Sequence, residues 1–269
     1  MVSSKDTSKS DDDLSAADAT DLHRTVREEG ETAVNRPAAA LLWSGLAAGI
    51  AINASLLFEG ALYAHLPDAP WRPTVVSLGY PIGFLIVVLG RMQLFTESTI
   101  TAMLPLATKP SLAALGRTLR LWALVILANL AGTALVASAM ASGLIGDDAL
   151  RAAMIAVSAK VMTLGAGATF LNAIPAGFFI AILAWTLPGA RAQSFLIISA
   201  ITYLVALAGF SHSIVGSSEV FLLIFSGKAS ALALIAASLI PAILGNLLGG
   251  AGIFALLAHA QVRSDAEAK

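Results

Sequence analysis

The chain has 269 residues, of which 57% are hydrophobic and only 12% are charged. Because an ordinary soluble domain is about 25% charged, most of this chain must be solvated by lipid rather than by water. The absence of cysteine excludes disulfide scaffolds and thiolate metal sites, and a formal net charge of −1 argues against a nucleic-acid-binding protein. The sequence has no Gly-Lys-Ser/Thr phosphate loop and no metal-ligand spacing, so we expect neither an enzyme, nor ATP-driven transport, nor a cofactor.

The first 36 residues differ in composition from the rest of the chain. They contain five basic and nine acidic residues and few large apolar side chains. Such a segment cannot bury enough surface to offset the entropy of folding by itself. We therefore expect residues 1–36 to form a disordered cytoplasmic arm, in which residues 14–31 are able to form one short surface helix with Ser15 as its N-cap.

The lengths of the uncharged stretches predict the number of membrane spans. Four stretches are long enough to hold one membrane helix each: 37–58, 121–146, 161–190 and 229–262. Two more spans each consist of a pair of stretches separated by a polar interruption: 73–90 with 98–108, and 192–218 with 220–227. The sequence thus predicts an all-α polytopic membrane protein with six transmembrane helices, of which the second and fifth are broken.

Basic residues predict the orientation in the membrane. They are concentrated in both tails and in the connections after spans 2 and 4. Because basic residues favour the cytoplasmic side, we expect both termini on the cytoplasmic side of a bacterial inner membrane. We therefore expect three parts: the arm (1–36), a transmembrane channel domain (37–262) and a cytoplasmic tail (263–269).

The two halves of the channel domain carry a weak internal repeat, 37–146 and 161–262. The segment ILANLAG around Asn129 matches ILGNLLG around Asn246, and equal spacings of 40 residues pair Asn53 with Asn172 and Gln93 with His212. Three spans per half require the second copy to be inverted. Inverted repeats with matching broken helices are typical of a solute pathway at the bilayer midplane.

The interruptions of spans 2 and 5 contain the polar residues that this pathway needs. An unpaired charge in hydrocarbon costs about 2.5–3.5 kcal/mol or more, so we expect Arg91 to pair with Glu97, Glu219 or both. His212 is the only imidazole near the expected centre, and its ordinary pKa near 6.5 suits a proton donor at neutral pH.

At these residues the chain resembles the formate/nitrite transporter family. The resemblance lies in residues 80–84 (YPIGF), 94–96 (LFT) and 209–214 (GFSHSI), and in Lys160, Asn172 and Asn246. It implies an aquaporin-like protomer of six spans and a homopentamer with one pore through each protomer, which carries small monovalent anions or their neutral acids.

The resemblance also implies positions in the pore. Tyr80, Phe84 and Val205 would form the constriction on the cytoplasmic side, and Leu94 and His212 would form the other, with Phe95 and Thr96 beside them. Lys160 would lie in the periplasmic vestibule and attract anions.

The chain departs from the family pattern at both breaks. Arg91 and Gln93 stand where the family usually has a small residue and an acid, and Ser211 stands where it usually has glutamate. These departures bear on the expected solute more than on the expected fold. A pore for neutral solutes of the aquaporin type, or a non-conducting scaffold or sensor, are the alternatives.

Overall fold

The computed structural model describes residues 18–267, and helices account for nearly all of them, with no strand among the described residues. Five helical segments are long and apolar enough to cross a membrane: Ala38–His65, Arg72–Leu89, Leu112–Ala141, Ala166–Gly189 and Ala231–Ser264. Two shorter apolar helices, Arg191–Leu207 and Ser213–Phe225, form one further span. The expected class, an all-α membrane protein with two broken spans, is confirmed.

The first half contains spans 1 to 3. They are built from α3 (Ala38–Ala51) with α4 (Ala54–His65), then α5 (Arg72–Val76), η1 (Ser77–Gly79) and α6 (Pro81–Leu89) with α7 (Phe95–Thr108), and finally α8 (Leu112–Ala141). The connection to the second half contains α9 (Asp148–Ser158) and η2 (Ala159–Met162).

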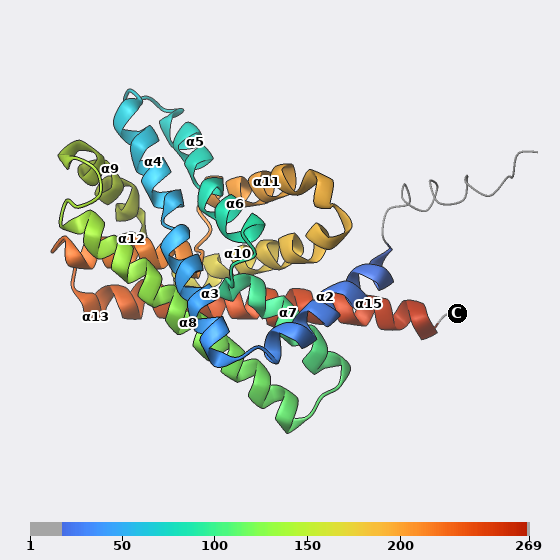
Figure 1. Cartoon of the computed structure of the whole chain (residues 1–269). Coiled ribbons are helices and arrows are strands. Elements are labelled where there is room, and N and C mark those ends of the chain that lie inside the picture. The colour runs from blue at the N-terminus through green and yellow to red at the C-terminus, as the bar shows by residue number, and fades with distance from the viewer. Residues whose placement is uncertain (1–17, 268–269) are drawn as a thin grey trace, which may run out of the picture.

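The second half repeats this plan. It contains α10 (Ala166–Thr186), η3 (Leu187–Gly189), η4 (Arg191–Gln193), α11 (Ser194–Leu207), α12 (Ser213–Phe225), α13 (Ala231–Leu234), α14 (Ile240–Leu247) and α15 (Ala255–Glu267), with the π-helical segments η5 (Ile235–Leu239) and η6 (Leu248–Phe254) on either side of α14. Figure 1 shows α9 and α13 on one side of the molecule and α2 with the end of α15 on the other. We call these the far face and the terminal face.

Both broken spans end their first helix with the same backbone motif. In span 2, Arg91 N–H donates to Val88 O (3.1 Å) and Met92 N–H to Val87 O (3.0 Å). In span 5, the equivalent bonds run from Gly209 to Ala206 (3.0 Å) and from Phe210 to Val205 (3.0 Å). These are Schellman motifs, which need a left-handed residue after the cap. Gly209 (φ 68°) fills that position without strain, whereas Arg91 (φ 51°) adopts it against its steric preference.

Glycines set the packing of the two halves in the same way. A Cβ on Gly49 of α3 would overlap the carbonyl oxygen of Asn129 on α8, and one on Gly177 of α10 would overlap that of Asn246 on α14. Such close backbone approach is typical of membrane helices that associate through small residues. The expected correspondence between Asn129 and Asn246 is therefore confirmed by geometry.

The rest of the expected repeat register is wrong. Because Gly49 corresponds to Gly177, Asn172 corresponds to Ser44 and not to Asn53. The hydrogen bonds agree, since Gln93 N–H donates to Ser44 Oγ (3.0 Å) and Ser211 N–H donates to Asn172 O (3.3 Å).

This register also changes the partner of the histidine. Gln93 corresponds to Ser211, so Leu94, the N-cap of α7, corresponds to His212, the N-cap of α12. The equal spacings of 40 residues arose by coincidence. Asn53 lies instead at the junction of α3 and α4, where its Nδ2 donates to Gly49 O (2.7 Å).

The second half of the arm is not disordered but forms the short helix that the sequence allowed, with other bounds. Residues Ala19–Val34 form α2, with Asp18 rather than Ser15 as the N-cap, and the side of α2 that carries His23, Val26 and Val34 is buried. Gly30 allows the close approach, because a Cβ there would overlap Thr101 O of α7. Residues 1–17 lie outside the described residues.

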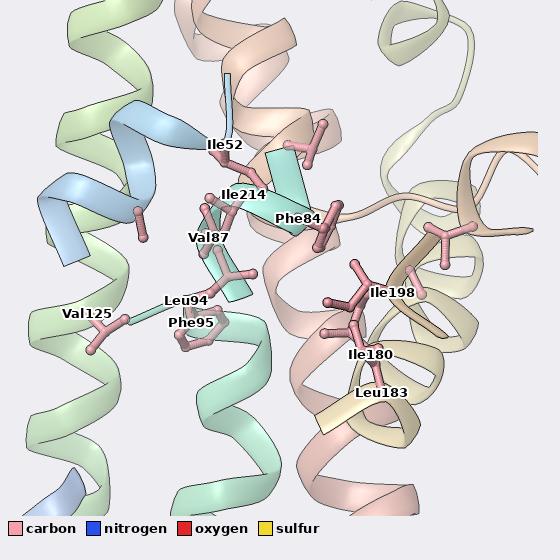
Figure 2. Close-up of a cluster of buried hydrophobic side chains, with 14 of the residues drawn as sticks. Ile52, Phe84, Val87, Leu94, Phe95, Val125, Ile180, Leu183, Ile198 and Ile214 are labelled. Atoms are coloured by element: carbon pink, nitrogen blue, oxygen red, sulfur yellow. The ribbon is translucent and has the colours of Figure 1, made fainter. Parts of the chain in front are cut away.

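The largest apolar core surrounds the breaks. Figure 2 shows Leu94 and Phe95 at the start of α7, near Val87 of α6, with Ile180 and Leu183 of α10 farther to the right. All five side chains are buried. The interrupted backbone is therefore enclosed by protein rather than exposed to lipid, as irregular structure within a membrane requires.

We predict that Gly249→Ala destabilises the fold, because its new Cβ would overlap Ile174 O on the backbone of α10. Overpacking of this kind costs about 1–3 kcal/mol, so the Tm of the purified protein in detergent should fall by several degrees. Gly116→Ala is the matched control, since no atom lies within 4 Å of its Cβ position. Equal Tm values for the two variants would contradict this packing.

Candidate functional site

Two cavities enter the protein from opposite faces. The far cavity has a volume of about 310 Å³ and is lined by residues that include Tyr80, Lys160, Asn172, His212 and Glu219. The terminal cavity, of about 680 Å³, lies beside α2, and its charged lining residues are Glu28, Glu29, Arg36, Arg91, Glu97 and Arg191. A narrow gap lined by Phe84, Val88, Leu94, Ile180 and Leu183, with Glu97 among them, adjoins the terminal cavity.

In each half, one asparagine forms hydrogen bonds with the backbone groups that the break leaves without helical partners. Asn129 Oδ1 accepts from Phe95 N–H (2.9 Å), and its Nδ2 donates to Gln93 O (3.0 Å) and to Gly45 O of α3 (2.8 Å). Asn129 is fully buried, so these bonds replace the water that is absent from the membrane interior.

Asn246 makes the symmetric set of bonds in the second half. Its Oδ1 accepts from Ser213 N–H (2.7 Å), and its Nδ2 donates to Ser211 O (2.9 Å) and to Ala173 O of α10 (2.8 Å). Each amide therefore holds both sides of a break at fixed positions against the neighbouring span.

His212 connects the two breaks. Its Nδ1 accepts from the backbone N–H of Val215 (3.2 Å), and its Nε2 lies 2.8 Å from Thr96 Oγ1. Because Val215 N–H can only donate, a neutral ring carries its proton on Nε2 and donates it to Thr96. The edge of the ring meets Phe84, with the ring centroids 5.0 Å apart, so the imidazole lies at the apolar gap.

The charged residues pair differently from the expectation. Glu219 forms an ion pair with Lys160 (3.0 Å) in the far cavity, whereas Arg91 lines the terminal cavity. Arg91 also has no ion pair within 4.0 Å among the described residues, although it shares its cavity with Glu97. The expected pairing of Arg91 with Glu219 is therefore wrong, because residues 91 and 219 lie on opposite sides of the gap. Arg91 and Glu97 interact electrostatically within the terminal cavity, but without a direct ion pair.

Burial lowers the pKa of the Lys160 ammonium group, but the nearby carboxylates of Glu219 and Glu59 raise it by more. The net pKa lies above the ordinary value, so Lys160 remains charged at neutral pH.

Tyr80 does not lie where the resemblance implied. It lines the same cavity as Lys160, not the opposite end of the pathway. The reason is chain direction: span 2 enters from the far face, so Tyr80 precedes the break and Leu94 follows it. Phe84 lies in the gap together with Leu94, whereas Val205 is buried in the apolar core and lines neither cavity.

Glu59 is a buried acid that is not among the site residues predicted from the sequence. This residue ends the first uncharged stretch, yet its side chain is buried (2% exposed) on α4, with Lys160 and Glu219 as its charged neighbours. In the sequence, the one indication of a functional role was the position of this acid directly after the uncharged stretch of the first span. Only the fold shows that it faces inward.

We predict that Asn246→Ala is severely destabilising, because it leaves Ser213 N–H and two carbonyl groups without partners. Each such loss costs about 1–3 kcal/mol, so the variant should lose most of its folded yield and have a much lower Tm. Asn35→Ala, which removes one exposed bond to Glu31 O, is the matched control and should change Tm little. Similar losses for both variants would show that Asn246 does not hold the break.

Comparisons with known proteins agree with this architecture. The inner membrane protein YfdC of Escherichia coli (strain K12) is 39% identical over 255 residues, which cover 95% of this chain and 82% of that protein. A solved FNT family ion channel matches with a TM-score of 0.78 and 22% identity, over 90% of this chain and 99% of that one. A pentameric formate channel with formate bound matches with a TM-score of 0.68 and 18% identity, over 84% and 98%.

At these low identities, the two structures show a shared fold. The family model for formate/nitrite transporters matches residues 20–260, a range that contains nearly all of α2, the first five spans and most of the sixth. The chain belongs to the formate/nitrite transporter family.

Proposed function

We propose that this chain forms a pore that carries small monovalent anions, such as formate or nitrite, or their neutral acids, across a bacterial inner membrane. The terminal face would lie in the cytoplasm. The family match and the bound formate in the related structure support the solute class. The description of YfdC as an inner membrane protein supports the location.

We further propose a homopentamer with one pore in each protomer. The pentameric assembly of the related formate channel supports this arrangement. Large apolar side chains on the outer surface, such as Trp43, Leu127 and Leu171, are exposed in the single chain and leave its outer surface suited to lipid or neighbouring protomers.

One observation carries the proposal: the two broken spans meet at the contact between Thr96 and His212, beside an apolar gap and the far cavity. Helices α7 and α12 both begin there, so their N-terminal ends place partial positive charge at the centre. This arrangement attracts an anion to the middle of the membrane, as broken helices do in other transporters.

The gap itself favours a neutral solute. Phe84, Leu94 and Leu183 offer no hydrogen bond to a desolvated anion, and burying such a charge is costly. Glu97, which also lines the gap, repels an anion when it is ionised. We propose that the solute crosses the gap as its neutral acid. His212 Nε2–H would donate a hydrogen bond to the solute in place of Thr96. A ring that has first taken up a second proton from water in the far cavity would pass one proton to a bound anion and return to its neutral form. Asn172, Lys160 and Tyr80 would bind the solute in the far cavity.

The test is flux into proteoliposomes that contain the purified protein, after its native mass has been measured in mild detergent. We expect a pentamer and rapid uptake of formate or nitrite, compared with empty liposomes. Uptake of glycerol without either anion would favour a neutral-solute pore. A protein that carries none of the three would contradict a conducting role, and a stable monomer or dimer would contradict the pentamer.

His212→Asn tests proton exchange at the centre. Asparagine fills similar space and can hydrogen-bond, but it cannot exchange a proton. We expect an intact oligomer whose formate flux has a changed dependence on pH. Intact assembly with the wild-type pH curve would limit His212 to hydrogen bonding. Failed assembly would assign it a structural role as the link between the two breaks.

A further inference from the structure

Glu59 is a buried carboxyl group that the proposed pathway does not use. Its side chain is 2% exposed, and its Oε2 has no hydrogen-bond partner among the described residues. A buried acid without a hydrogen bond is costly, and natural proteins seldom keep one without a reason. Its charged neighbours are Lys160, which follows α9, and Glu219 on α12.

Glu219 connects this buried group to the solute pathway. His212, Gly216 and Glu219 are spaced by four and three residues at the start of α12, so they lie on one face of that helix, and all three line the far cavity. No atom lies within 4 Å of the Cβ position of Gly216, which leaves open space between the other two side chains. Glu219 therefore lies about 10 Å from His212, along the route that a solute would take.

The three charges do not balance. Two carboxyl groups and one ammonium group give this site a net charge of −1 when both acids are ionised, in a region where Glu219 is only 3% exposed. Among the residues that line the far cavity, only Lys160 and Glu219 carry a formal charge at neutral pH. The other titratable groups that face them are Tyr80 and His212, and the pair Asp148–Arg151 on α9 is balanced and partly exposed. One proton restores neutrality at the lowest cost.

We propose that Glu59, Lys160 and Glu219 form a proton-uptake site that loads the far cavity with both a proton and an anion. The inference rests on the proposed function, because it identifies where the transported acid is assembled. While Glu219 is ionised, it occupies Lys160 and excludes a solute anion. When a proton from water binds the Glu219 carboxylate, Lys160 is released and the anion binds its ammonium group.

The proton then moves to the anion. The O–H bond of Glu219 breaks, an O–H bond forms on the solute, and the resulting neutral acid moves toward His212. The Glu219 carboxylate returns to Lys160, so each cycle carries one proton with each anion and leaves the protein unchanged. Glu59 is a positioning residue here. As a second carboxyl group beside Glu219 and Lys160, it leaves the site with one excess negative charge when both acids are ionised, and so favours the uptake of one proton by the pair without touching the solute.

The experiment measures the KM for formate in proteoliposomes from about pH 5.5 to about pH 8. In the wild type KM should rise with pH, because ionised Glu219 competes for Lys160. In Glu219→Gln, KM should vary less than about twofold over this range while the maximal rate falls, because the competitor and the proton donor are both lost. Glu59→Gln should shift the rise in KM to lower pH. Asp148→Asn, which removes an exposed acid from the same face, should behave like the wild type.

An assembled Glu219→Gln protein that keeps the wild-type rise in KM would overturn the proposal, because the neutral acid would then come from bulk water. If that variant fails to assemble, Glu59→Gln decides the question, and an unshifted KM curve overturns the proposal.

Infrared pH titration tests the site without transport. The carbonyl band of a protonated carboxyl group should appear as the pH falls and be absent from the double variant Glu59→Gln/Glu219→Gln. A protein that carries no formate but shows this band would refute the proposed function and leave the proton site standing. A missing band in the wild type would overturn the proton site.

Discussion

The structure depends on one constraint: backbone that leaves the helical conformation inside a membrane must have every hydrogen bond satisfied by protein. Spans 2 and 5 both break inside the protein, and Asn129 and Asn246 supply the missing partners with the same three bonds. Each amide can do so only because glycines bring its helix against the neighbouring span. Tight packing, the breaks and the central histidine are therefore consequences of one arrangement.

That arrangement also separates two chemical environments along the pathway. The far cavity contains one ion pair and a histidine whose nitrogen atoms both have protein partners. The terminal cavity contains three arginines and three glutamates, and Arg91 is held there in a left-handed conformation where the other repeat has glycine. Between them, the apolar gap discriminates against charge. The protein thus excludes free ions at its narrowest part while it retains ionisable groups on both approaches.

The sequence predicted the features that depend on the free-energy cost of placing individual residues in lipid. Charges are expensive in lipid, so the uncharged lengths located all six spans and both interruptions, and the motifs around His212 identified the family. The features that failed depend on relations between distant segments. Equal spacings of 40 residues could not show which residue of α10 corresponds to which residue of α3 in the repeat. The correspondence of Ser44 with Asn172 appears only in their hydrogen bonds to the two breaks. In the same way, the pairing of Lys160 with Glu219 depends on how η2 approaches α12. The sequence does contain a pattern that indicates the burial of α2, because its buried residues recur every three or four positions: His23, Val26, Gly30 and Val34. The acidic composition of the arm obscured this pattern.

The central claim is that the pathway consists of two half-pathways separated at the helix breaks. Because the chain has no cysteine, a single introduced cysteine shows from which side a position is accessible, without labelling of native thiols. The most direct measurement is labelling of Ser211→Cys and Met92→Cys by a membrane-impermeant thiol reagent added to one side of the membrane at a time. The account predicts that Ser211→Cys reacts only from the far face and Met92→Cys only from the terminal face. Reaction of both positions from the same face would contradict it.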